Sequence, residues 1–322
     1  MDVVCLGEAL IDMFPAEIGR PLAEVSAFHP KPGGAPANVA VAAARLGASA
    51  AFLGEVGDDA FGRFLIDTLA AEGVDTRGMR VDRTARTTLA VIAMPDPQRA
   101  EFIFYRQPGQ DMGLRPDDID TRLLGAARAF HCGPLSLIDE PGRSATLRAM
   151  TTARKAGALV SFDVNYRPSI WPHPEEALAV TASVIHLAHL LKVNEHEMRL
   201  LSGHDDPAVG SAALLARGPA LVVVTLGARG SYFRSAEADG FVPAFPVETI
   251  DAIGCGDAFM AGVLVGLAAG TAEKAWRARL GEVHLRPILR YASAVGALTA
   301  TRHGALPALP RAAEVEAFLA GR

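Results

Sequence analysis

The chain has 322 residues, of which 50% are hydrophobic, with a formal net charge of −5 and an isoelectric point near 6.0. This length is enough to bury a full core, and the acidic balance excludes a basic surface for nucleic acid or acidic membranes. No apolar run approaches the ~20 residues that span a bilayer, and no basic segment precedes a hydrophobic one at the N-terminus. The cysteines Cys5, Cys132 and Cys255 lack metal-ligand spacing, which predicts reduced thiols and a cytoplasmic protein.

Short apolar runs alternate with longer stretches of helical periodicity along the chain. Strands rich in Val, Ile and Leu that are spaced by helices predict a parallel sheet covered on both faces. The lack of a Pro-, Gly- or Ser-rich linker predicts one continuous domain over residues 1–322. The expected strands are 3–7, 51–56, 129–132, 159–163, 190–193 and 221–226, and the expected helices are 37–46, 61–72, 144–156, 174–184, 195–202 and 209–216.

Two segments near the N-terminus have the composition of a ligand site. Asp12 is predicted to follow the first strand, and ligands in open α/β sheets gather beyond the carboxyl ends of strands. Gly33 and Gly34 lead into a helix with Pro36 in its first turn, and a glycine pair lets a ligand lie against the backbone. Asn38 offers a donor and an acceptor to hydroxyls. An exposed loop aspartate and a plain helix start are the alternatives.

The region from 87 to 110 interrupts the alternation. Residues 87–93 and 101–105 are β-rich runs, and the segment 94–99 between them is typical of a hairpin turn. Together with residues of about 12–30, these runs predict a small sheet outside the main one. An ordinary edge hairpin is the alternative.

Two further segments follow predicted strands in the second half. Asn194 and Glu197 offer the oxygen ligands that Mg²⁺ prefers, although a glutamate in the first turn of a helix is also favoured by the helix dipole. The segment 225–230 has glycines at 227 and 230, and it does not have the pattern of a dinucleotide-binding loop.

The segment 248–259 carries the most specific chemistry. Gly254 and Gly256 let the first amides of the following helix, which carry partial positive charge, approach an anion. Asp257 would repel that anion, but it could take a proton from a hydroxyl that attacks a phosphate. This arrangement predicts phosphoryl transfer to an alcohol. The alternative is that Asp257 only caps the helix.

In their order along the chain, these segments resemble the signatures of the ribokinase/fructokinase (PfkB-type) sugar kinases. Residues 251–259 are similar to the family pattern Asp-Thr-x-Gly-Ala-Gly-Asp-x-Phe, with Ala252 and Cys255 as the departures, and residues 33–40 are similar to Gly-Gly-x-x-x-Asn-x-Ala. The resemblance implies a single doubly wound, Rossmann-like (ribokinase-like), mostly parallel sheet with helices on both faces. It also implies a small β-sheet lid, at about 12–30 and 87–110, that often pairs with a second subunit.

The resemblance also implies roles for individual residues. Asp257 would be the catalytic base, and the amides of Gly254, Cys255 and Gly256 would form an anion hole. The implied sugar contacts are Asp12, Gly33, Gly34, Asn38, Tyr105, Arg106 and Arg167. The implied nucleotide contacts are Lys192, Asn194, Thr225, Gly227, Gly230 and Ser293. ATP and Mg²⁺ are the implied cofactors, with Asn194 and Glu197 organising Mg²⁺ through water and Asp251 as a candidate neighbour of a monovalent cation such as K⁺.

The identity of the acceptor depends on two arginine-containing runs. The Tyr105-Arg106 pair and the run 163–167 resemble fructokinases, so we expect ATP-dependent conversion of D-fructose to fructose 6-phosphate. Kinases of 2-keto-3-deoxygluconate and 5-dehydro-2-deoxygluconate share similar runs, and two arginines would suit such an acidic acceptor. Ribose is the third candidate. A sensor that binds sugar or nucleotide without catalysis is the alternative from another class, although Asp257 and both glycines of the anion hole are retained.

Overall fold

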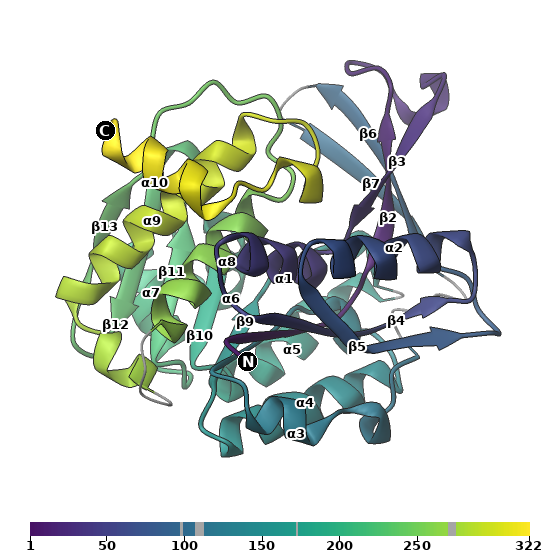
Figure 1. The fold of residues 1–322 in the computed structure, drawn as a ribbon. Helices are drawn as coiled ribbons and strands as arrows, with labels where there is room; N and C mark the ends of the chain where they lie inside the picture. Colours follow the sequence, from purple (N-terminus) through teal and green to yellow (C-terminus); the bar gives the residue numbers. More distant parts are fainter. Residues whose placement is uncertain (97–98, 107–112, 172, 270–274) are drawn as a thin grey trace.

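A large twisted sheet forms the centre of the computed structural model, which describes residues 1–96, 99–106, 113–171, 173–269 and 275–322 (Figure 1). The strand order is β13-β12-β11-β10-β9-β8-β1-β4-β5, and the neighbours from β11 to β5 are parallel, whereas β12 and β13 are antiparallel. The strands are β1 (Val3–Leu6), β4 (Ala50–Gly57), β5 (Val74–Asp82), β8 (Ala129–Cys132), β9 (Leu159–Asp163), β10 (Leu190–Asn194), β11 (Leu221–Thr225), β12 (Gly230–Ser235) and β13 (Asp239–Pro243).

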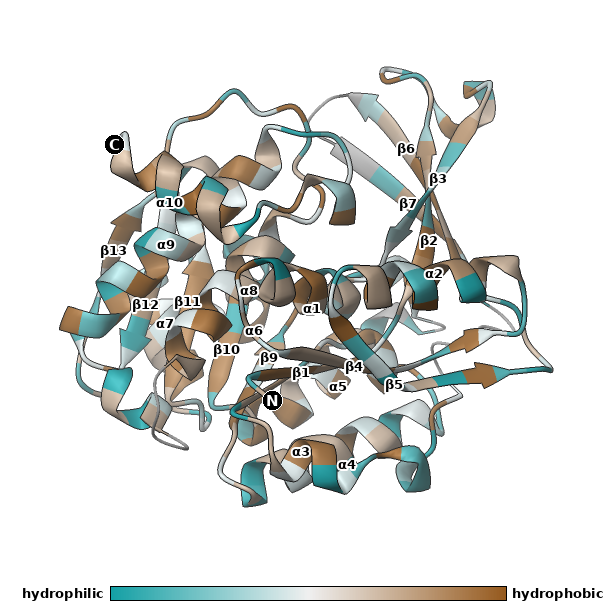
Figure 2. Ribbon diagram, in the orientation of Figure 1, coloured by the Kyte–Doolittle hydropathy of each residue, from teal (hydrophilic) through white to brown (hydrophobic). Residues whose placement is uncertain are grey.

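Helices cover both faces of this sheet, and each face has its own core. One core contains side chains of α1, α2, α8, α9 and α10, and the other contains side chains of α3 to α7. Figure 2 colours the central strands mostly brown, as expected for strands that are buried on both sides. The helices are α1 (Ala35–Arg45), α2 (Ala60–Ala71), α3 (Thr121–Gly125), α4 (Gly142–Lys155), α5 (Pro174–Val184), α6 (Glu195–Ser202), α7 (Pro207–Leu215), α8 (Cys255–Ala268), α9 (Glu282–Ala300) and α10 (Ala312–Ala320).

A second sheet of four strands stands beside one end of the large sheet (Figure 1). It has its own small core of Phe14, Ile92 and Met94, against which Phe102 and Ile253 pack. This arrangement confirms the predicted small sheet, although residues 97–98 and 107–110 of the predicted lid segment lie outside the described residues. In the order β3-β2-β6-β7, the strands are β2 (Leu10–Pro15), β3 (Phe28–Gly33), β6 (Leu89–Asp96) and β7 (Arg99–Tyr105).

Asp12 lies in the second sheet, in agreement with the small-sheet segment predicted at about 12–30, and not directly at the end of the first strand of the large sheet. The first strand of the large sheet ends at Leu6, and Asp12 is the third residue of β2, in the second sheet. The chain changes sheets at Gly7, which has φ +149° and at which a Cβ atom would lie 2.6 Å from Pro36 Cγ. A glycine tolerates this conformation, which other residues rarely adopt. Asp12 therefore approaches the site from the second sheet.

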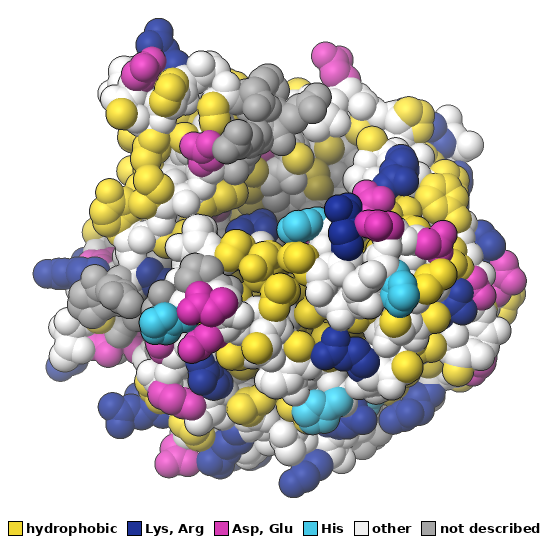
Figure 3. All heavy atoms as spheres, turned by 180° about the vertical axis from the view of Figure 1, so that it is seen from behind, with side chains coloured by type: hydrophobic (Ala, Val, Ile, Leu, Met, Phe, Trp, Pro, Cys, Tyr) yellow, Lys and Arg dark blue, Asp and Glu magenta, His cyan; other side chains and the backbone are white. Residues whose placement is uncertain are grey.

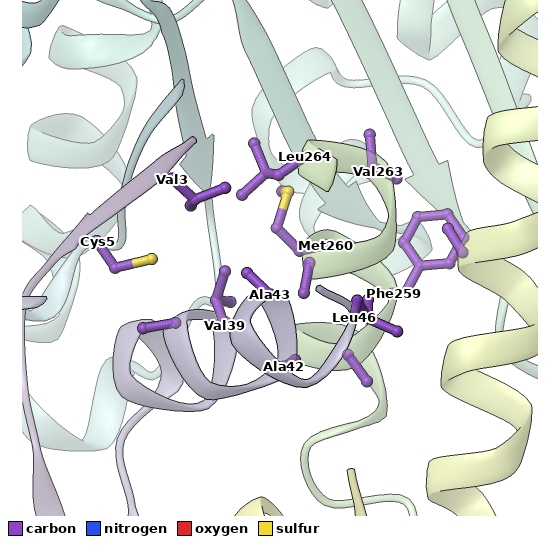
Figure 4. Close-up of a cluster of buried hydrophobic side chains, with 14 of the residues drawn as sticks. Val3, Cys5, Val39, Ala42, Ala43, Leu46, Phe259, Met260, Val263 and Leu264 are labelled. Carbon is purple, nitrogen blue, oxygen red and sulfur yellow. The ribbon is translucent and has the colours of Figure 1, made fainter. Parts of the chain in front are cut away.

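Close packing of α1 against α8 fixes the two helices that carry Asn38 and Asp257. Figure 4 shows Val39 and Ala43 of α1 beside Met260 and Leu264 of α8, and all four side chains are at most 1% exposed. Small side chains in α1 let the helix backbones approach closely, which limits movement between them. The relative position of Asn38 and Asp257 is therefore set by the core.

Charged side chains of both signs are interspersed on the face that Figure 3 shows, without a continuous basic surface over its described residues. None of the helices in the described part of the chain is both long and apolar enough to cross a membrane.

Candidate active site

Helix α8 begins at the segment that the sequence singled out. Its N-cap is Gly254, at φ +80°, where a Cβ atom would lie 2.9 Å from Ala305. Only glycine adopts this conformation without strain. Asp257 is the third residue of the helix rather than its cap, and its Oδ2 atom accepts a 2.8 Å hydrogen bond from Asn38 Nδ2. The geometry therefore excludes the alternative in which Asp257 serves only as an N-cap.

A cavity of about 300 Å³ opens in front of Asp257, between the large sheet and the second sheet. Its lining is strongly acidic, with five carboxylates and two cationic side chains. Asn38, at 4% exposure, also lines it, and its Oδ1 atom has no hydrogen-bond partner among the described residues. A buried acceptor of this kind requires a donor. The charged residues are Glu8, Asp12, Asp163, Asp251 and Asp257, and Arg167 and Lys192.

Two carboxyl groups in this lining have pKa values that are raised towards neutral pH. Burial raises the pKa of Asp257 to about 6, with a further contribution from the charge of Asp163, against the opposing hydrogen bond from Asn38. Burial also raises the pKa of Asp12 to about 7, helped by the charges of Asp257 and Asp251. Such values suit a group that exchanges protons near neutral pH.

Lys192 forms a buried ion pair with Asp163. Lys192 Nζ lies 2.6 Å from Asp163 Oδ2, and the two side chains, on paired positions of β10 and β9, are 8% and 5% exposed. Burial alone would lower the pKa of Lys192, but the charges of Asp163 and Glu197 outweigh it, so the pKa is raised. A Cβ atom on Gly256 would lie 3.3 Å from Nζ. The ammonium group therefore faces the N-terminus of α8 and lines the smaller cavity.

A second cavity, of about 580 Å³, lies on the other side of that helix N-terminus. Ala252 and Gly256 line both cavities, so the two cavities meet beside Asp257, and Cys255 lines the larger one. Apart from Lys192, the predicted nucleotide contacts lie in this lining, namely Asn194, Thr225, Gly227, Gly230 and Ser293.

Three predicted sugar contacts lie outside the lining of the smaller cavity. Tyr105 is 65% exposed at the end of β7. Arg106 is buried, and its Nη2 atom donates to the carbonyl oxygen of Leu135 at 2.7 Å. Gly33 lies directly against the carboxylate of Asp12, where a Cβ atom would overlap it. These three residues therefore do not contribute to the lining of the smaller cavity.

The remaining predicted contacts lie in the smaller cavity or beside it. Asp12, Gly34, Asn38 and Arg167 are in its lining. Asp251 also lines it. Its side chain connects the loop before α8 to a second loop, because Oδ1 accepts a hydrogen bond from the amide of Ile253 and Oδ2 accepts one from the amide of Gly304.

The structure adds residues to which the sequence analysis assigned no role. Glu8, Asp163 and Asn165 all line the smaller cavity. Asp163 is the last residue of β9, so the rule about carboxyl ends of strands could have identified it. Glu8 Oε1 accepts from the amide of Ala35, at the start of α1. No local signal distinguishes this glutamate from an exposed one.

Two cavities that meet at a helix N-terminus, with the carboxylate of Asp257 beside their border, form the arrangement expected for a kinase that acts on an alcohol. The chain matches the pfkB family carbohydrate kinase model over residues 1–312. It belongs to this family of carbohydrate kinases, which confirms the resemblance seen in the sequence.

Similar proteins and structures agree with this assignment. The chain is 42% identical over 322 residues to probable fructokinase-2 of Arabidopsis thaliana, with 98% of this chain and 95% of the relative covered. It is 43% identical over 314 residues to fructokinase-1 of Zea mays, with 97% and 96% covered. The structure of a fructokinase with bound ATP from Xylella fastidiosa superposes with a TM-score of 0.91 at 36% identity, with 99% of this chain and 98% of that chain covered. A fructokinase from Vibrio cholerae bound to fructose, ADP and calcium superposes with a TM-score of 0.87 at 34% identity, with 99% of both chains covered.

Proposed function

We propose that this protein transfers the γ-phosphoryl group of ATP to the 6-hydroxyl of D-fructose. The observation that carries the proposal is the shared border of the two cavities, where Ala252 and Gly256 line both and Asp257 lies beside them. The smaller cavity would hold the sugar and the larger one the nucleotide. The similar structures from Xylella fastidiosa and Vibrio cholerae, with ATP in one and fructose and ADP in the other, support this division.

In this proposal Asp257 accepts the proton of the attacking hydroxyl. The hydrogen bond from Asn38 orients its carboxylate, and the raised pKa makes it a stronger base than an exposed aspartate. The amides of residues 254–256 and the ammonium group of Lys192 would stabilise the negative charge on the phosphoryl group in transfer. The packing of α1 and α8 and the ion pair with Asp163 hold these groups in position, so little reorganisation is needed.

The composition of the smaller cavity favours a neutral polyol over a sugar acid. Its carboxylates would accept hydrogen bonds from sugar hydroxyls, and so would Asn38 Oδ1, which has no partner in the described part of the chain, whereas the carboxylates would repel an acceptor that carries a carboxylate. Arg106, one of the two arginines that would suit an acid, is directed to the carbonyl of Leu135. Arg167 is the arginine that lines the cavity, and its guanidinium group lies over the Phe102 ring.

ATP would enter with a divalent cation. Among the described residues no group of three His, Cys, Asp or Glu side chains is arranged to hold a metal ion. This fits Mg²⁺ at nucleotide sites, where phosphate oxygens and waters supply most ligands. Asn194, which lines the nucleotide cavity, would meet it through water. A fructokinase structure from Vibrio cholerae contains potassium, and we extend this to a K⁺ ion beside Asp251.

We further propose that residues 1–322 act as one kinase domain with the second sheet as a lid. Met94, Phe102 and Phe104 of that sheet line the sugar cavity, so closure there would exclude water and limit ATP hydrolysis. Ile103 and Tyr105 are exposed on β7, at the edge of the second sheet, and offer apolar contacts for a second copy. The three free thiols favour a cytoplasmic location.

The reaction is tested by ADP release with Mg-ATP and K⁺ across D-fructose, 2-keto-3-deoxygluconate, 5-dehydro-2-deoxygluconate and ribose. We expect D-fructose to give a kcat/KM at least about tenfold above the others, because each good polar match in a buried site is worth about that factor or more. A sugar acid as the best substrate would contradict the argument from the acidic lining. Binding of fructose without turnover of ATP would favour a sensor.

The titration of Asp257 and Asp12 predicts an acid limb in the pH profile. Each carboxyl group is needed as a carboxylate, and their raised pKa values are about 6 and about 7. Protonation below these values removes the base and the hydrogen-bond acceptor, so kcat/KM for fructose is expected to fall as the pH drops from 7 towards 6. Measurement of kcat/KM across this range checks the expectation. A flat profile down to pH 5 would contradict it.

A further inference from the structure

Glu197 has two hydrogen-bonding roles, of which only one is local. It is the third residue of α6, and its side chain is 2% exposed. Its Oε2 accepts from the Asn194 amide at 2.8 Å, and Asn194 Oδ1 accepts from the Glu197 amide at 2.9 Å. This is a capping box, which satisfies the amides at a helix start and uses one oxygen of the glutamate. The other oxygen reaches a different part of the chain.

That second oxygen holds the turn that follows β9. Glu197 Oε1 accepts from the amide of Tyr166 at 2.8 Å. We call residues 163–167 the acceptor turn, because Asp163, Asn165 and Arg167 of this segment line the smaller cavity. Asn165 has φ +32°, a conformation that is uncommon outside glycine, although asparagine adopts it more readily than most residues. Hydrogen bonds on both sides stabilise it here, because the Asn165 amide donates to Asp163 Oδ1 and the Tyr166 amide donates to Glu197 Oε1.

The same geometry does not fit Glu197 as a direct metal ligand in either cavity. It is absent from the lining of both cavities, and both of its oxygens accept backbone hydrogens. Burial raises the pKa of Glu197, and the charge of Asp163 adds to this effect against the opposing charge of Lys192. A buried carboxyl group that is held by two backbone donors acts as a structural acceptor.

We propose that Glu197 is a positioning residue that holds Asn165 and Arg167 in the sugar-binding conformation of the acceptor turn. The inference rests on the proposed function, because it takes the smaller cavity as the fructose site. It adds a second role to the water-mediated part in magnesium binding that the sequence resemblance implied.

The test uses fructose binding without metal or nucleotide. Calorimetric titration of D-fructose in EDTA compares the wild type with Glu197→Gln, whose amide has one oxygen and cannot accept both backbone hydrogens. We expect Glu197→Gln to bind fructose about tenfold more weakly, because the turn loses a charge-assisted bond. The matched control is Glu195→Gln, which removes a charge from the same helix turn, where the partly exposed Glu195 pairs with Arg229. Its fructose affinity should equal that of the wild type.

Wild-type fructose affinity in Glu197→Gln would overturn the inference. If the kinase assay of that variant then also required about tenfold more Mg²⁺, the role of Glu197 would lie in metal binding alone, as loss of a metal-bound group produces this requirement. Hydrogen exchange of residues 164–167 separates the proposed positioning role of Glu197 from the proposal that the acceptor is fructose. If these amides exchange faster in Glu197→Gln and the wild type does not bind fructose, the positioning role is retained and fructose is rejected as the acceptor. If Glu197→Gln does not fold, Glu197→Asp, which is too short to reach both amides, allows the same comparison.

Discussion

Replacement of Asp257 by asparagine is expected to lower turnover of D-fructose about a thousandfold, the loss typical of a missing general base. Asparagine has nearly the same shape, and its oxygen can still accept the hydrogen bond from Asn38 Nδ2, so the helix and cavity should be retained. Fructose affinity is therefore expected to stay within about threefold of the wild type, which separates a loss in the transition state from a loss of binding. Steady-state kinetics and calorimetry provide the two measurements.

A stability measurement sharpens this prediction. The folded-state pKa of Asp257 lies above its ordinary value because the group is buried. At a pH above that pKa, Asp257 is ionised in the folded state, although burial disfavours its charge. Asp257→Asn removes this unfavourable charge and should therefore raise the melting temperature at pH 8. Asp67→Asn, at an exposed aspartate of α2, is the control, and neither its turnover nor its melting temperature should change. Retention of more than a tenth of wild-type turnover by Asp257→Asn would remove the base assignment.

Replacement of Lys192 by methionine is expected to reduce both stability and turnover. The side chain volume is similar, but Asp163, which is 5% exposed, is left as a buried charge without its partner. Breaking a buried pair in this way costs about 3–5 kcal/mol of unfolding free energy. Turnover should fall about a hundredfold, because a positive charge facing the anion hole is lost. Chemical denaturation and steady-state kinetics measure these effects.

The double variant Asp163→Asn/Lys192→Met distinguishes the two contributions. It removes the uncompensated charge, so it should recover most of the stability that Lys192→Met loses, while turnover stays low. Recovery of turnover together with stability would mean that Lys192 contributes only to folding. No difference in stability between the double variant and Lys192→Met would contradict the buried ion pair.

In the large sheet, the strands that the sequence predicted are the central ones, which are buried on both faces. Residues 129–132 and 159–163 were predicted with the bounds of β8 and β9, because continuous apolar runs leave few alternatives. The two edge strands of the large sheet, β5 and β13, and the strand β12 next to β13 were not predicted. In β5, Val74 is the one buried residue, and an edge strand with one covered face carries a weak hydrophobic pattern.

Arg106 illustrates how side-chain direction escapes sequence reasoning. Tyr105 and Arg106 lie at the end of β7, whose Phe102 and Phe104 line the smaller cavity, but successive residues of a strand point to opposite faces. Tyr105 is exposed, and Arg106 turns inward to the carbonyl of Leu135 instead of entering the sugar cavity. The sequence motif therefore indicates the segment, but it does not determine which of its side chains line the cavity.

Asp257 and the glycines beside it could be identified from the sequence because an anion-binding helix start is a local structure, built from adjacent residues. The alternation of apolar strands and helices is similarly local, and it was sufficient for the fold class. The partners of Asp257 were decided only by tertiary structure, since its hydrogen bond with Asn38 joins residues 219 positions apart. The acidic cavity and the second role of Glu197 also depend on contacts between separate elements. Such contacts follow from how α1, α8 and the two sheets pack together, and local propensity carries no information about that packing.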